Sequence, residues 1–153
     1  MGQLIRSDSE AILRVLLLEA VDRDGQRLLD ALQGGGHSLY SRQMAQRNEL
    51  EEALRNESWD VVLLSCSLPG FPPEEAVDLL LEIAPDIPVI LTVDRGSLEF
   101  PFALLENGAC DFVFKSNPTR LLAVIERECA KVQLSYEQHQ ALVSAQNIDG
   151  IDE

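Results

Sequence analysis

Four polar residues, each at the end of an apolar run, are the first candidates for chemistry in this sequence. They are Glu19, Ser65, Thr92 and Lys115. A carboxylate, two hydroxyls and an ammonium group can form an ion pair, exchange hydrogen bonds or supply a hydroxyl nucleophile. Whether they act together depends on the elements that carry them.

Ser65 does not fit the nucleophile of a hydrolase. No Gly-x-Ser-x-Gly turn surrounds it, and the two histidines, His37 and His139, are predicted in a loop after a helix and in the C-terminal tail. The glycine run 34–36 follows a predicted helix and precedes a predicted strand, the reverse of the order in nucleotide-binding glycine loops. We therefore expect no enzymatic activity and no cofactor.

Five apolar runs alternate with five amphipathic segments along the chain. The runs predict strands over residues 14–19, 38–44, 60–65, 88–92 and 111–115, of which the polar 38–44 segment suits a sheet edge. This alternation predicts an α/β fold, a doubly wound parallel sheet with helices on both faces. Functional residues of such sheets lie beyond the carboxyl ends of the strands, so the four polar residues are expected to meet there.

Short local signals predict where the helices begin and end. Asp22 is expected to cap the first helix and the glycines 34–36 to stop it. Asn48 with Glu51 resembles a capping box for the second helix, and Pro73 suits the first turn of the third.

The composition is that of one globular domain with short ends. A formal net charge of −14 over 153 residues argues against a nucleic-acid partner, because neutralising phosphates requires clustered Lys and Arg. We expect a leader over 1–12, a domain over 13–132, and a helical extension with a flexible linker over 133–153. The chain shows no membrane span, no signal peptide and no paired CxxC cysteines, so a cytoplasmic location is expected.

Three segments carry a resemblance to response-regulator receiver domains: residues 59–70, with Pro69-Gly70 in the turn after a strand, then 89–92, and 108–115. The similarity runs from about Leu13 to Lys131. It implies a flavodoxin-like five-stranded sheet of order 2-1-3-4-5 with five helices. It also implies a site made of an acidic pair, a phosphoacceptor Asp, a Thr or Ser, and a Lys.

The sequence departs from that site at two positions. Ser65 stands where the acceptor Asp is expected, and Glu19-Ala20 replaces the acidic pair. A serine cannot form an acyl phosphate, and it adds no charge to attract Mg²⁺, which loses its waters reluctantly. The resemblance therefore implies a non-phosphorylatable pseudo-receiver that binds no metal, in which Lys115 pairs with Glu19 beside Thr92.

Two alternatives stay open at this edge. Asp22, Asp24 or Asp94 could replace the lost carboxylates, so that a displaced Asp still accepts a phosphoryl group. Cys66 could instead act as a redox-sensitive thiol, provided that it is partly exposed.

The resemblance also implies how such a module would act. Phe112 stands at the receiver switch position, and Ser116 replaces the Pro that usually follows the Lys. We expect contact with a protein partner or a fused output domain in two-component signalling or a phosphorelay, or homodimer formation. The expected surface comprises Leu98, Phe102, Leu105, Leu122, Ile125, Cys129 and Val132.

Overall fold

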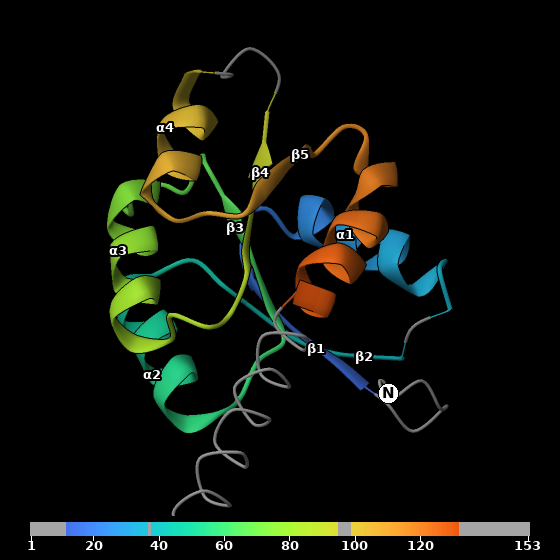
Figure 1. Cartoon of the computed structure of the whole chain (residues 1–153), viewed down its shortest axis with the longest axis horizontal. Coiled ribbons are helices and arrows are strands. Elements are labelled where there is room, and N and C mark those ends of the chain that lie inside the picture. Colours follow the sequence, from blue (N-terminus) through green and yellow to red (C-terminus); the bar gives the residue numbers. More distant parts are fainter. Residues whose placement is uncertain (1–11, 37, 95–98, 132–153) are drawn as a thin grey trace, which may run out of the picture.

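The computed structural model describes residues 12–36, 38–94 and 99–131 (Figure 1). Residues 1–11 of the predicted leader, the extension over 133–153 and both histidines lie outside the described residues, as do Leu98 and Val132 of the expected surface. Ile12, the last residue of the predicted leader, begins the first strand.

One parallel sheet organises the chain. Its strands are β1 (Ile12–Leu18), β2 (Ser38–Met44), β3 (Val61–Ser65), β4 (Val89–Val93) and β5 (Asp111–Phe114). They are ordered β2-β1-β3-β4-β5, with every neighbouring pair parallel. The predicted fold class, strand order and edge position of β2 are therefore confirmed.

Helices cover both faces of the sheet (Figure 1). They are α1 (Asp22–Gln33), α2 (Arg47–Asn56), α3 (Pro73–Ile83), α4 (Glu99–Asn107) and the short 3-10 turn η1 (Pro118–Arg120), which leads into helical residues 121–131. Helix α1 and residues 121–131 pack on one face, while α2, α3 and α4 pack on the other.

The inner strand β1, which lies between β2 and β3, shows why this sheet is buried on both sides. Val15 and Leu17 contribute to the core under α1 and residues 121–131, whereas Leu16 and Leu18 contribute to the core under α2, α3 and α4. All four are 0% exposed. Burying such a side chain contributes about 1.5–3 kcal/mol, so a continuous apolar run is more stable here than an alternating one.

Two predicted helix caps are wrong, each by a residue or two. Asp22 is the first residue of α1 rather than its cap, which is Val21. The capping box of α2 is made by Gln46 and Glu49, whose Oε1 accepts a hydrogen bond from the Gln46 N–H at 3.2 Å. Local sequence signals locate a helix start only to within one or two residues, and both differences are of that size.

A polar network closes the exposed edge at β2. Glu57 accepts hydrogen bonds from Tyr40 Oη at 2.8 Å and from Arg42 Nη1 at 2.5 Å. The guanidinium of Arg14 lies 4.5 Å above the centroid of the Tyr40 ring and bonds Glu57 at 3.3 Å. These contacts tie β1, β2 and the end of α2 together.

Candidate functional site

The predicted site residues meet around the ammonium group of Lys115, the residue that follows β5. Its Nζ lies 2.8 Å from Ser65 Oγ, 2.9 Å from Glu19 Oε1 and 3.2 Å from Ser67 Oγ. An ammonium group has three N–H donors, and these three oxygens come from the carboxyl ends of β1 and β3. The predicted pairing of Lys115 with Glu19 is confirmed.

This cluster is almost closed to solvent. Glu19 is 4%, Ser65 1% and Lys115 5% exposed. Two buried charges are tolerated only when each has a close partner, because desolvating either one alone is costly. Glu19 meets this condition with Oε2, which accepts the Val21 N–H at 3.0 Å, while Oε1 faces Lys115 without a hydrogen bond of good geometry.

A chain of hydroxyl contacts extends the cluster to β4. Ser67 Oγ lies 3.2 Å from Ser65 Oγ and donates a hydrogen bond to Asp94 Oδ2 at 3.0 Å. The Ser67 N–H in turn donates to Ser65 Oγ at 3.2 Å. The turn after β3 is thereby fastened to the residue that follows β4.

Thr92 and Ala20 lie at the site but take no part in the polar contacts that the structure describes around Lys115. Thr92 is 1% exposed and pairs with Ser65 in the β3–β4 register, but within the described residues its hydroxyl makes no hydrogen bond to Lys115 or Ser65. Ala20 is exposed and offers only a methyl group. The register brings both to the edge, yet the polar contacts run through Ser67 instead.

The three aspartates considered as replacements are held differently. Asp24 Oδ2 lies 3.8 Å from Lys115 Nζ, whereas Asp22 Oδ1 accepts a hydrogen bond from Gln43 at 3.3 Å. Asp94 reaches the cluster only through the Ser67 hydroxyl. Asp24 and Asp94 are thus brought near the site, and Asp22 is directed toward β2.

The donor set does not fit Mg²⁺. This ion prefers carboxylate oxygens in octahedral geometry, but Ser65 carries none and the carboxylate of Glu19 faces the Lys115 ammonium. Among the described residues, no group of three His, Cys, Asp or Glu side chains is arranged to hold a metal ion.

Cys66 is only partly buried, as a redox role would require, but its chemistry is unfavourable. Burial raises the pKa of the Cys66 thiol to about 11, against the smaller opposing effect of the Lys115 charge. The thiolate is the reactive form, and it is a minor species at neutral pH when the pKa is so high.

The expected interaction surface is only partly at the surface. Phe102 is 53% exposed and its ring meets that of Phe112 edge-on, with centroids 6.0 Å apart. Ile125, in contrast, is 1% exposed and lies in the core, so its inclusion in the surface was wrong. Leu122 and Cys129 are partly buried against the same core. The apolar stripe of the helical residues 121–131 therefore faces the sheet.

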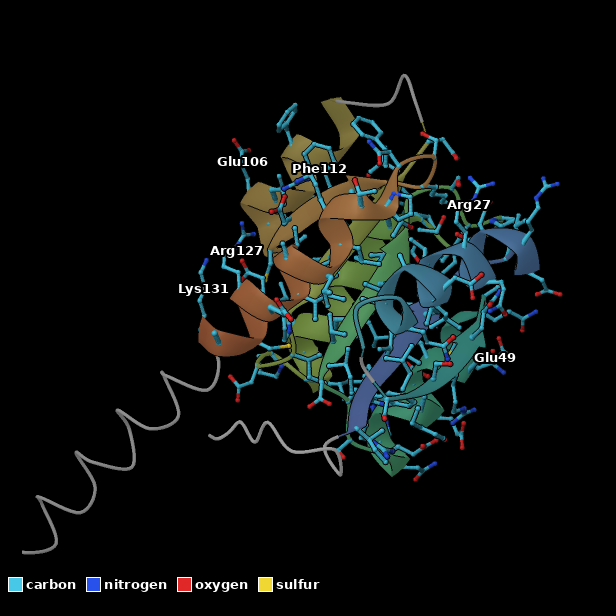
Figure 2. All side chains as sticks on the ribbon, turned by 90° about the vertical axis from the view of Figure 1, so that its right-hand side faces the viewer. Arg27, Glu49, Glu106, Phe112, Arg127 and Lys131 are labelled. Carbon is cyan, nitrogen blue, oxygen red and sulfur yellow. The ribbon has the colours of Figure 1, made fainter. Side chains whose placement is uncertain are left out.

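An ionic network fixes residues 121–131 to the start of β5. Arg127 Nη2 lies 2.6 Å from Asp111 Oδ2, and Arg127 Nε lies 3.0 Å from Glu128 Oε2, which Lys131 also approaches at 3.2 Å (Figure 2). These residues, like Ser67, were not singled out from the sequence. The signal for Ser67 was its position two residues after Ser65, inside the turn that carries the resemblance.

Solved structures of other proteins share the fold of this chain. A receiver domain protein from Methanospirillum hungatei is 21% identical, with a TM-score of 0.69 over 82% of this chain and 99% of that one. NtrX from Brucella abortus, in complex with ADP, is 22% identical, with a TM-score of 0.74 over 84% of this chain and 30% of that one. The chain has the receiver-domain fold.

One curated protein is related in sequence to this receiver-fold domain. A protein-glutamate methylesterase/protein-glutamine glutaminase from Azospirillum brasilense is 30% identical over 115 residues, which are 74% of this chain and 26% of that protein. The chain thus spans about a quarter of its relative's length. No family model matches the sequence.

Proposed function

We propose that this chain is a pseudo-receiver, a signal-transduction module that takes up no phosphoryl group on aspartate and acts through protein contact. The observation that carries this proposal is the position of Lys115. Its ammonium group is bonded to Ser65 at 2.8 Å and to Glu19 at 2.9 Å, among residues where a receiver would hold a metal ion and an acceptor carboxylate.

An internal cation replaces an external one in this arrangement. The Lys115 charge balances Glu19 without any ion from solution, and its Nζ is already engaged by hydrogen bonds to Ser65 and Ser67. The local charge supports the same conclusion, since the carboxylates of Glu19 and Asp24 lie against Lys115 and that of Asp94 lies against Ser67, and together they would repel an anionic phosphodonor.

The proposed output is a contact with another protein, made by residues 13–132 as the folded domain. Phe102 of α4 and its ring contact with Phe112 form the exposed part of this surface. The partner is a fused output domain, a separate protein or a second copy, and we expect the module in the cytoplasm and without enzymatic activity. No described helix is long and apolar enough to cross a membrane.

Incubation with acetyl phosphate and Mg²⁺, followed by intact-mass measurement, tests the proposal. We expect no added phosphoryl group on this chain. The matched positive control is the double variant Ala20→Asp, Ser65→Asp, which restores the missing carboxylates and should gain a hydroxylamine-labile adduct in a Mg²⁺-dependent manner. A hydroxylamine-labile adduct on Asp22, Asp24 or Asp94 of the unaltered chain would overturn the proposal and establish phosphorylation through a displaced Asp.

Light scattering tests the contact itself. The molar mass is measured for chains that end before and after Lys131. It is also measured for the variant Phe102→Ser, whose smaller polar side chain removes the exposed ring. If the chain is a dimer and this surface is used, Phe102→Ser should dissociate it. A dimer that tolerates Phe102→Ser must use another surface.

A further inference from the structure

Ser67 differs from Ser65 in one property that decides what can reach it. Ser65 is 1% exposed, whereas Ser67 lies on the surface in the turn between β3 and α3. The Ser67 hydroxyl nevertheless reaches the buried cluster, accepting a hydrogen bond from Lys115 Nζ at 3.2 Å. It is an accessible group in direct contact with a buried ammonium.

The same hydroxyl also holds a carboxylate. Ser67 Oγ donates its single proton to Asp94 Oδ2 at 3.0 Å, so the hydrogen bond joins the turn after β3 to the residue after β4. Asp94 immediately follows β4, the strand that precedes α4 along the chain. This hydrogen bond therefore depends on a proton that any substitution at the oxygen would remove.

We propose that Ser67 is a serine phosphorylation site and that its modification rearranges the lysine cluster. In the reaction, an ATP-dependent serine kinase forms the bond between Ser67 Oγ and the γ-phosphorus. The bond from that phosphorus to the bridging oxygen breaks to release ADP, and the hydroxyl proton passes to the kinase's base. This inference rests on the proposed function, because an exposed serine takes over the role that the absent aspartate would have.

Electrostatics give the direction of the change. Phosphoserine carries nearly two negative charges and no proton to donate, so the bond to Asp94 is lost and replaced by repulsion. The phosphoryl oxygens instead accept from Lys115 Nζ, in competition with Glu19. Glu19 is buried and its Oε2 is held by the Val21 N–H, whereas Asp94 is exposed, so Asp94 is the group that moves.

Amide hydrogen exchange on the chain with phosphoserine installed at position 67 during translation tests this. We expect exchange at the end of β4 and in α4 to quicken about tenfold or more relative to the unmodified chain. The matched control carries phosphoserine at Ser116, an exposed serine next to Lys115. Unchanged exchange at β4 and α4, or an equal change from Ser116, overturns the proposal.

The variant Asp94→Asn isolates the cause. It removes the repelling charge but keeps a hydrogen-bonding side chain at an exposed position where folding is not at risk. Phosphoserine at position 67 should then quicken exchange much less than in the parent chain, and an undiminished effect contradicts the repulsion from Asp94. The acetyl phosphate experiment reports separately on aspartate, so failure of either proposal is seen independently.

Discussion

Lys115 Nζ and Glu19 Oε1 lie 2.9 Å apart, and their side chains are only 6% and 3% exposed. Such a pair ties the end of β5 to the end of β1, across the two strands that separate them in the sheet. Its contribution to stability differs sharply from that of surface pairs, and this gives the first prediction.

Replacing either member alone should be strongly destabilising. Lys115→Met or Glu19→Leu leaves a buried charge without its partner, which costs about 3–5 kcal/mol of unfolding free energy. The double variant should recover most of this loss, because both charges are then gone. Urea denaturation of the parent chain, the two single variants and the double variant measures the coupling free energy between the two residues. Simple additivity of the two losses would contradict the pairing.

An exposed pair supplies the matched control for that cycle. Arg47 and Glu51 on α2 lie 3.6 Å apart, with side chains 51% and 38% exposed. Their double-variant cycle should give a coupling of only about 0.3–0.5 kcal/mol.

Stability should fall at low pH partly through Glu57. Hydrogen bonds from Tyr40 and Arg42 hold the pKa of this carboxyl below its ordinary value of 4.5. A depressed folded-state pKa contributes stability that is present above the unfolded value and is lost as pH falls through the folded one. Urea denaturation at stepped pH should show a shallower acid decline for Glu57→Gln, and identical slopes would count against this assignment.

Cys66 should react slowly with alkylating reagents at neutral pH. A thiol pKa of about 11, compared with an ordinary 9.0, means roughly a hundredfold less thiolate in the folded chain. Iodoacetamide labelling followed by peptide mapping should show a much faster reaction at Cys66 in urea than in buffer. Equal rates would revive a redox role for this residue.

A side chain at Gly108 should destabilise the fold, through its positive φ and through the shift it forces on Leu81. Its φ is 136°, and a Cβ atom there would lie 2.8 Å from Leu81 Cδ1, so Gly108→Ala should cost about 1–3 kcal/mol. Gly36 has a φ of 91° with open space around it, so Gly36→Ala isolates the backbone cost. Thermal unfolding that ranks Gly36→Ala as the worse variant would contradict this account.

The strands of the sheet can be predicted from the sequence more clearly than the side-chain contacts at its carboxyl edge. Buried runs such as Val15–Leu18, alternating with amphipathic segments, favour strands covered on both faces, and the ends of such parallel strands bring Lys115 beside Glu19. The position of Ser67 two residues after Ser65 places it in the turn after β3, but its contact with Lys115 depends on how that turn folds back.

Helical periodicity has a similar limit. The spacing of Leu122, Ile125 and Cys129 marks one face of a helix. The same spacing is expected whether that face contacts a partner protein or the sheet of its own domain. Only the packing of residues 121–131 against the sheet shows that Ile125 belongs to the core.

The position of β1 between β2 and β3 has a consequence for how the chain is made. Its partners in the sheet are β2 and β3, and Val15 pairs with Val61, so the apolar first strand has no complete set of neighbours until β3 is available. During synthesis from the N-terminus, this strand must therefore leave the ribosome well before it can be buried. Stalled or truncated chains that end before β3 should consequently be the ones most in need of a chaperone.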